Sequence, residues 1–268
     1  MKQILLINDV VGYSHVGMVA MLPILTYLGH APYNLPTALV SNTLDYGRFN
    51  ILETTDYMRG TIPVWRELGF RFDAVCTGLM FSERQARIVS DYCAELRKEG
   101  ATVFVDPIMG DGGRLYNGMG PENVALMREM VSGADLTFPN YTEACYLTDT
   151  AYKVEGMTWA ESCEMLDRLL SLGARSAIVT SARVAGKTCV IGKAEGRVFC
   201  LDYDEIPVLF HGTGDIFSAV LIGHLLKGEP LEQSTATAMQ VVSRLIERNK
   251  ELPDKCRGIP IEQCLDLL

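Results

Sequence analysis

The stretch PVLFHGTGDIFSAVLIGHLLK, residues 207–227, decides the fold of this 268-residue chain. Its first four residues are mostly apolar and predict an extended segment. From Asp215 onward the apolar residues recur at helical spacing, and Gly228 followed by Pro230 predicts where that helix ends. The turn Gly-Thr-Gly-Asp at 212–215 therefore lies between an extended segment and the start of an apolar helix.

Gly212, Thr213 and Gly214 precede Asp215 at this helix start. Glycines let the backbone turn sharply and approach a ligand, and the first N–H groups of a helix suit an anion. A carboxylate beside an anion site is expected where a hydroxyl lies between the two. The turn thus predicts attack of a substrate hydroxyl on a phosphoryl group, with Asp215 as the base and N–H groups as donors to the developing charge. The alternative is a helix that is only capped by Thr213 or Asp215.

Length and composition favour one α/β domain spanning residues 1–268. Hydrophobic residues make up 48% of the chain and are evenly distributed along it, so a large core can form. The net charge of −9 argues against nucleic acid as a partner, although it allows a nucleotide whose phosphates carry a metal ion. No stretch reaches the roughly 20 apolar residues of a membrane span, and MKQILLIND at the start predicts a strand, not a secretion signal. Eight scattered cysteines without a Cys-x-x-Cys pair indicate reduced thiols in a cytoplasmic protein.

Strand-like and helical segments alternate through most of the chain. This alternation predicts a three-layer sandwich, in which a mostly parallel central sheet is covered by helices on both faces. Strands are expected at 2–7, 35–40, 73–77, 101–105, 134–138 and 176–179, with a hairpin at 187–191 and 197–201. Helices are expected at 18–28, 55–68, 82–98, from 121, near 143, and at 158–172, 215–227 and 231–248. Capping-box spacing, from Ser82 to Gln85 and from Thr158 to Glu161, predicts the starts of two of them.

Polar residues follow several of these strands. Asp9 and Tyr13 come after the first strand, where ligands gather in α/β folds, although a turn aspartate and a packed tyrosine would also explain them. Asp106 and Asp111 lie in the run 106–120, which holds five glycines. Mg²⁺ prefers carboxylate oxygens together with substrate phosphates, so this run predicts a metal and phosphate site. The alternative is a long glycine-rich surface loop.

Asn140 and Glu143 follow the strand expected at 134–138. A glutamate at a helix start is usually a cap, and contact with a metal or phosphate is the other interpretation. Because the carboxyl ends of parallel strands meet at one sheet edge, we expect a phosphate and metal site with a base beside it. Four sites are expected to converge there: Asp9, 106–113, 140–143 and 212–215.

The chain resembles the ribokinase-like superfamily, and within it the pyridoxal/pyridoxamine kinases. The resemblance covers nearly the whole length, and its most specific motif is FHGTGDIF at 210–217. DP-x-x-GD at 106–111 and PN-x-x-E at 139–143 favour vitamin kinases over sugar kinases. The other segments that carry it are IND…GYSHVG, LPTALVSN followed by Tyr46, VDPIMGD, PNYTEACYLT and Val179-Thr180-Ser181.

The resemblance implies a role for each site residue. Asp215 is implied as the catalytic base, with Gly212, Thr213 and Gly214 forming the anion hole. Members of the family are cytoplasmic homodimers that need ATP and Mg²⁺ and often a monovalent cation such as K⁺. The residues implied for Mg²⁺ are Asp106, Asp111 and Glu143, and those for the nucleotide are Asp106, Asn140, Glu143, Thr180 and Ser181. The residues implied for the vitamer are Asp9, Tyr13, Asn42, Leu44, Asp45, Tyr46 and Leu79.

The sequence departs from the family pattern at the acceptor pocket. The usual Ser-Asn-His-Thr is Ser-Asn-Thr-Leu at 41–44, and Phe138 replaces the usual Thr before Pro-Asn. Leu79 occupies a position that often carries an aromatic ring stacked on the pyridine. Leucine offers neither a hydroxyl hydrogen bond nor a ring face, so the identity of the acceptor depends on these positions. Phe81 is a candidate for the missing ring.

Three functions follow as hypotheses. The leading one is ATP-dependent phosphorylation of the hydroxymethyl group of pyridoxamine, pyridoxal or pyridoxine to the 5′-phosphate. The second is a kinase for hydroxymethylpyrimidine or another small alcohol. The third is a non-catalytic protein that keeps the fold and binds pyridoxal phosphate or a nucleotide. The complete base and anion hole favour an enzyme.

Overall fold

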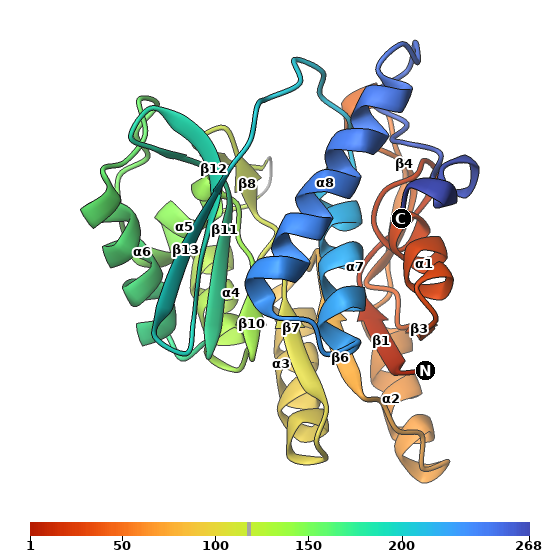
Figure 1. The fold of residues 1–268 in the computed structure, drawn as a ribbon. Helices are drawn as coiled ribbons and strands as arrows, with labels where there is room; N and C mark the ends of the chain where they lie inside the picture. The colour runs from red at the N-terminus through yellow and green to blue at the C-terminus, as the bar shows by residue number, and fades with distance from the viewer. Residues whose placement is uncertain (117–118) are drawn as a thin grey trace. The chain divides into compact units, whose positions relative to one another are not determined.

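The structure is a computed structural model that describes residues 1–116 and 119–268 (Figure 1). The chain forms two compact units. Met1–Cys76 and Ile206–Leu268 make up the first unit, and Thr77–Glu205 makes up the second. Both ends of the chain therefore belong to the first unit, while the second is a single continuous segment.

Strand β1 (Gln3–Ile7) is the centre of the main sheet of the first unit. It pairs in parallel with β3 (Ala31–Asn34), and β6 (Ala74–Thr77) is its other neighbour. Residues 4–7 are all buried, as expected for a strand that is covered on both faces. The first predicted strand is confirmed.

A separate three-stranded sheet in the first unit consists of β2 (Val10–Tyr13), β4 (Ala38–Asn42) and β5 (Ile51–Glu53). The predicted strands do not include β2, and the next one is expected to start at residue 35. That start is wrong because Leu35 N and Thr37 N still donate backbone hydrogen bonds to Leu6 O in β1 and to Asn8 O just after it. The chain joins β2 only afterwards, and there Tyr13 lies opposite Asn42.

The helices of the first unit are organised around α7 (Thr213–Leu226), which packs against α1 (Met18–Tyr27) and α8 (Leu231–Asn249). Residues 216–223 of α7 are all buried. At Gly223 a Cβ atom would lie 2.4 Å from Cδ1 of Leu28, so glycine lets the Leu28 side chain pack directly on the α7 backbone. The remaining helical segments are α2 (Thr55–Glu67), η1 (Leu44–Tyr46), η2 (Ile261–Gln263) and η3 (Leu265–Leu267).

The second unit has a sheet in the order β13-β12-β11-β10-β7. Its parallel strands are β7 (Thr102–Val105), β10 (Leu136–Thr137) and β11 (Ser176–Val184), and β12 (Lys187–Ala194) and β13 (Arg197–Asp202) add an antiparallel extension. The helices are α3 (Glu83–Lys98), α4 (Pro121–Ser132), α5 (Tyr141–Thr148) and α6 (Trp159–Ser171). The caps predicted at Ser82 and Thr158 are confirmed, since each accepts a hydrogen bond from the backbone N–H three residues later.

Strand β11 continues further than the sequence predicts. The expected end of the strand is residue 179. At that point the pairing with β12 is only interrupted, between Val179 and Ala182, where Ser181 has a φ of 52°. The strand resumes at Ala182 because Ala185 and Gly186, with φ of 49° and 80°, form the tight turn that a hairpin requires. Thr180 and Ser181 thus lie within a strand and not after one.

The glycine-rich run 106–120 contains a small hairpin of β8 (Gly110–Asp111) and β9 (Arg114–Leu115). Gly112 and Gly113 have φ of 59° and 81°, and positive φ at both central residues is typical of a two-residue hairpin turn. Asn117 and Gly118, near the end of the predicted loop, lie outside the described residues. Among the helices that the structure describes, none is both long enough and apolar enough to span a membrane.

Candidate active site

The carboxylate of Asp215 is held by two groups from the start of the chain. Gly17 N donates to its Oδ2 at 2.8 Å, and Asn8 Nδ2 donates to its Oδ1 at 3.3 Å. Removal from water raises the pKa of Asp215, and these two hydrogen bonds oppose the rise. The hydrogen bonds fix the orientation of the side chain, which is half-buried and so still accessible to a small molecule.

Asp9 lies on the other side of Gly17. A Cβ atom at Gly17 would lie 2.7 Å from both the carbonyl oxygen and Oδ1 of Asp9, and the φ of Gly17 is +58°. Burial, and secondly the charge of Asp215, raises the pKa of Asp9 to about 7. The two carboxyl groups therefore have different environments, and Asp9 retains its proton nearly to neutral pH.

The first turn of α7 is open at its N-terminal end. Gly212, the N-cap, has a φ of 80°, and a Cβ atom there would lie 2.8 Å from His15 O, so this position requires glycine. Thr213 Oγ1 donates to Phe210 O at 3.3 Å, away from the helix. Among the described residues no side chain caps this turn, so its amide groups can serve an anion. A helix capped only by Thr213 or Asp215 is not what the structure contains.

Two tyrosine rings lie together beside this turn. The ring centroids of Tyr13 and Tyr46 are 6.4 Å apart at an interplanar angle of 57°, and the two residues are 55% and 40% exposed. Such half-exposed rings offer faces for a flat heterocycle. Leu79, the other expected acceptor residue, is half-buried in the second unit.

The turn that carries Tyr46 is tied to the start of α7. Asp45 Oδ2 lies 3.2 Å from Nε2 of His211, the residue before Gly212. Asn42 Nδ2 donates to Thr43 O at 3.0 Å and to the carbonyl of residue 48 at 2.9 Å, which holds the loop closed. Leu44 in this turn is 46% exposed. Asp9, Tyr13 and residues 42–46 are thus grouped around Gly212 and Asp215 within the first unit.

In the second unit, Asn140 and Glu143 form a capping box at the start of α5. Asn140 Oδ1 accepts from Glu143 N at 3.0 Å, and Glu143 Oε2 accepts from Asn140 N at 2.8 Å. Glu143 Oε1 also accepts from Met109 N at 3.0 Å, and Asn140 Nδ2 donates to Gly110 O at 2.8 Å. Burial chiefly, and the nearby charge of Asp111, raise the pKa of Glu143. The capping interpretation of Glu143 is confirmed, and the pair also fixes the glycine-rich hairpin.

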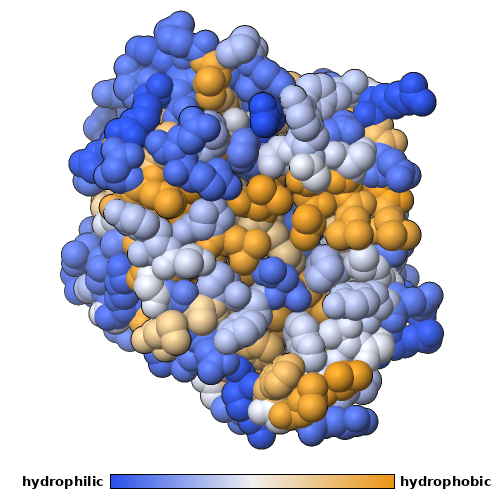
Figure 2. Space-filling view, turned by 90° about the vertical axis from the view of Figure 1, so that its right-hand side faces the viewer, coloured by the Kyte–Doolittle hydropathy of each residue, from blue (hydrophilic) through white to orange (hydrophobic). Residues whose placement is uncertain are grey.

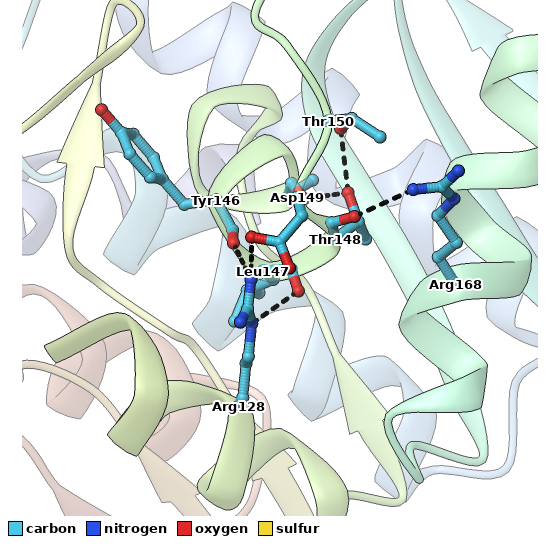
Figure 3. A network of polar contacts seen from close by, with 8 residues as sticks. Arg128, Tyr146, Leu147, Thr148, Asp149, Thr150 and Arg168 are labelled. Atoms are coloured by element: carbon cyan, nitrogen blue, oxygen red, sulfur yellow. Dashed lines mark hydrogen bonds and ion pairs between the residues drawn. The ribbon is translucent and has the colours of Figure 1, made fainter. Parts of the chain in front are cut away.

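The far end of α5 is held by two arginines (Figure 3). Arg128 donates to the carbonyl groups of residues 146 and 147 at 2.7 and 2.9 Å, and pairs with Asp149 at 2.6 Å. Arg168 donates to Thr148 O at 3.2 Å. Cationic groups at a helix C-terminus satisfy its last carbonyls and its dipole. Helix α5 is therefore anchored at both ends, which fixes the position of its capping box.

Of the other residues expected for the nucleotide and the metal, Thr180 lies beside the capping box of α5. Thr180 N donates to Pro139 O at 3.0 Å and Thr180 forms a β-bridge with Asn140, so these two residues adjoin. Asp106 is half-buried at the end of β7, and Asp111 is exposed. Within the described part of the chain, the acidic residues expected for Mg²⁺ do not bring three ligand atoms within 4.8 Å of one another. Mg²⁺ commonly binds through one or two carboxylates with phosphates and water, which Asp106 and Asp111 still fit.

Some residues of the first-unit site were not expected from the sequence. Asn8 precedes Asp9 at the same strand end. Because ligands gather at strand ends in α/β folds, the argument that identified Asp9 could also have identified Asn8. His211, Asp254 and Arg257 carry no such signal, because their partners are far away in the sequence: Asp254 and Tyr46, for example, are 208 residues apart.

Known proteins are similar to this chain over most of its length. Residues 26–259 match the phosphomethylpyrimidine kinase family. A pyridoxine/pyridoxal/pyridoxamine kinase from Bordetella avium is 30% identical over 249 residues, which cover 85% of this chain and 79% of the relative. A pyridoxal kinase from Rubrobacter xylanophilus is 28% identical and covers 91% of this chain and 87% of its own length.

Solved structures show the same fold. A Bacteroides thetaiotaomicron protein assigned to the phosphomethylpyrimidine kinases, crystallised with pyridoxal, is 34% identical, covers 99% of this chain and 95% of its own, and has a TM-score of 0.93. Pyridoxal kinase from Leishmania donovani, in complex with ADP and pyridoxamine, is 25% identical with a TM-score of 0.85 and covers 99% and 95%. The predicted α/β fold with a mostly parallel sheet is confirmed. The chain therefore belongs to the phosphomethylpyrimidine kinase family of sequences and, within the ribokinase-like superfamily, to the pyridoxal kinases.

Proposed function

We propose that this protein transfers the γ-phosphoryl group of ATP to the hydroxymethyl group of a B6 vitamer and so forms the vitamer 5′-phosphate. The observation that carries the proposal is the Asp215 carboxylate, oriented by Gly17 and Asn8 at the uncapped start of α7. The solved relatives support it, since one was crystallised with pyridoxal and another with ADP and pyridoxamine. The enzyme is thus a phosphotransferase with an alcohol acceptor.

Asp215 is proposed to accept the proton of the hydroxymethyl group as its oxygen bonds to the γ-phosphorus. The bond between the β- and γ-phosphates breaks, and ADP leaves with the electron pair. The amide groups of Gly212, Thr213 and Gly214 are proposed to stabilise the negative charge on the phosphoryl oxygens. The helix dipole of α7 adds to this effect.

The nucleotide and Mg²⁺ are assigned to residues of the second unit. Asp106 and the exposed Asp111 suit Mg²⁺, which would neutralise charge on the phosphates. Glu143 uses both carboxylate oxygens in backbone hydrogen bonds, so we assign it chiefly to holding Asn140 and the hairpin. Thr180 and Ser181 are proposed nucleotide contacts, and a monovalent cation such as K⁺ is a proposed activator.

The acceptor is assigned to the first-unit residues Asp9, Tyr13 and 42–46, together with Leu79. The rings of Tyr13 and Tyr46 are proposed to stack on the pyridine in place of the aromatic ring that is missing at Leu79. A ring from the first unit is preferred here to Phe81, because Tyr13 and Tyr46 lie in the loops that contact residues 211–215.

We also propose that residues 1–268 act as one kinase domain in a cytoplasmic homodimer. Leu39 and Leu52 are cross-strand partners on β4 and β5, yet they are 46% and 60% exposed. Figure 2 shows apolar side chains gathered on the face seen from the right-hand side of Figure 1, where β3 and β4 are labelled. Apolar patches of this kind are usually covered by a partner. All eight cysteines are free thiols, which supports a reducing compartment.

An acceptor panel tests the proposed reaction. Purified protein, ATP and Mg²⁺ would be given pyridoxal, pyridoxine, pyridoxamine or 4-amino-5-hydroxymethyl-2-methylpyrimidine, with ADP release and ³¹P NMR as measurements. We expect a phosphate ester of at least one pyridine, formed with a kcat/KM well above that for the pyrimidine. A preference for the pyrimidine, or ADP release that is independent of every acceptor, would contradict the proposal.

A further inference from the structure

The chain near its C-terminal end packs against the loops that carry the two tyrosine rings. The hydroxyl of Tyr46 donates to the carboxylate of Asp254. His15 N donates to Arg257 O at 2.7 Å, in the loop that follows Tyr13. Because side-chain and backbone bonds both contribute, residues 254–257 form a fixed wall beside these loops.

Arg257 presents its guanidinium group on this wall. The guanidinium carbon lies 4.8 Å from the centroid of the Tyr13 ring, and the backbone N–H of Arg257 donates to Asp254 Oδ1 at 3.3 Å. The side chain is exposed, and within residues 1–116 and 119–268 it has no ion-pair partner. A guanidinium stacked on a ring keeps its N–H groups in the plane, where they can bind an anionic oxygen.

The loop between residues 13 and 17 connects Arg257 with the catalytic base. At one end Tyr13 lies under the guanidinium, and at the other end Gly17 N holds Asp215. In the middle, His15 O is the atom nearest to the Cβ position of Gly212 and also to that of Gly258, at 2.8 Å in both cases. The wall and the glycine-rich turn therefore border the same short loop.

The ring of a B6 vitamer carries an oxygen beside the position of the aldehyde or amine. This oxygen is largely ionised at neutral pH because the ring nitrogen holds a proton, whereas hydroxymethylpyrimidine has no such oxygen. A charge-assisted hydrogen bond from arginine would favour the pyridine over the pyrimidine. We propose that Arg257 is a specificity residue that binds this anionic ring oxygen, and that Asp254 positions Tyr46 beside it. This inference rests on the proposed function.

The test compares acceptors that differ only in the ring oxygen. Arg257→Leu and Arg257→Lys would be assayed with pyridoxine and 3-deoxypyridoxine, and Arg248→Leu is the control. Arg248 is an exposed arginine on α8 that pairs with Asp266 at 2.6 and 2.7 Å. For Arg257→Leu, we expect kcat/KM for pyridoxine to fall roughly 10- to 100-fold, mainly through KM, as for a lost hydrogen bond to a charged group. The value for 3-deoxypyridoxine should stay within about threefold of wild type, and lysine should restore part of the loss for pyridoxine.

Other outcomes separate the inference from the reaction itself. Wild-type protein that phosphorylates pyridoxine, with Arg257→Leu unchanged or equally impaired on both acceptors, would overturn the specificity role and leave the proposed function standing. Wild-type protein that phosphorylates no pyridine would overturn both. Should Arg257→Leu fold poorly, the ultraviolet absorbance of pyridoxine bound to wild-type protein gives a second readout that needs no variant. We expect the ring hydroxyl to ionise at lower pH on wild-type protein than in free solution, and no such difference would refute the contact.

Discussion

Asp9 is a buried carboxyl group beside the proposed base, and burial and the charge of Asp215 raise its pKa to about 7. The ordinary pKa of an aspartate carboxyl group, as in an unfolded chain, is 3.8. Between these two pH values the unfolded chain has lost the proton while the folded chain keeps it. The folded state then binds more protons than the unfolded state, so the free energy of unfolding decreases as pH rises through this window.

The variant Asp9→Asn should remove this dependence because an amide does not titrate. In urea unfolding from pH 5 to pH 8, wild type should lose about 3 kcal/mol of stability relative to Asp9→Asn, mostly between pH 5 and pH 7. Asp73→Asn is the control, because hydrogen bonds from Gln3 N and Lys2 lower the pKa of Asp73. The contribution of Asp73 to the free energy of unfolding is therefore lost as pH falls and not as it rises. Parallel pH profiles of wild type and Asp9→Asn would show that Asp9 ionises normally.

At the scale of elements, the N-terminus of α7 has two glycines with different roles. Gly212 has a positive φ and His15 O close to its Cβ position, whereas a Cβ atom at Gly214 would meet nothing within 4 Å. Gly212→Ala should therefore destabilise the fold, by about 1–3 kcal/mol, and Gly214→Ala should leave stability equal or slightly higher.

Activity distinguishes the two positions further. If the amides at the start of α7 contact the phosphoryl group, the added methyl of Gly214→Ala should reduce kcat although the protein is stable. The measurements are thermal unfolding and kcat with pyridoxal. Unchanged kcat in Gly214→Ala would place the phosphoryl group elsewhere.

Helices α5 and α6 offer a matched pair of capping boxes. Asn140→Ala and Thr158→Ala each remove an N-cap hydrogen bond, at a cost of about 1 kcal/mol in stability. Only Asn140 also donates to Gly110 O in the glycine-rich hairpin. We expect KM for ATP to rise in Asn140→Ala and to stay unchanged in Thr158→Ala, measured at saturating pyridoxal. An equal effect of both variants on KM would remove the nucleotide role of Asn140.

The elements themselves could mostly be predicted, because apolar periodicity and caps are local signals. The N-cap of α6 at Thr158 and the course of α7 follow from the pattern alone. Strand β2 and the continuation of β11 could not be predicted, since each depends on a partner strand that the local sequence does not identify. Asp9 and Asp215 could be identified from the sequence because a strand end and a glycine-rich turn are visible in the local sequence. Arg257 could be identified only from its contact with Tyr13 in the folded chain.

At the scale of the whole molecule, the proposed homodimer depends on the exposed face of the small sheet. Leu52→Glu should weaken association, because it would bury a charge in an apolar interface. Leu209→Glu is the control, since Leu209 is 74% exposed outside any strand. Sedimentation velocity should show dimers for wild type and Leu209→Glu and monomers for Leu52→Glu. Monomeric wild type would contradict the proposal.

The convergence of the sites at Asp9, 106–113, 140–143 and 212–215 on one edge remains a prediction from the sequence. The structure groups Asp9 with Asp215 in the first unit and Asn140 with Thr180 in the second. Catalysis requires base, acceptor and nucleotide to act together, so the rate of the chemical step depends on the whole molecule.

The most direct measurement is the single-turnover rate of pyridoxal phosphorylation by wild type and Asp215→Asn, with ATP and Mg²⁺ saturating. Asparagine preserves the shape and cannot accept the proton, so we predict that the rate falls by about 10²–10⁴-fold while ADP binds as before. A rate within a few-fold of wild type would contradict the assignment of Asp215 as the base and the mechanism built on it.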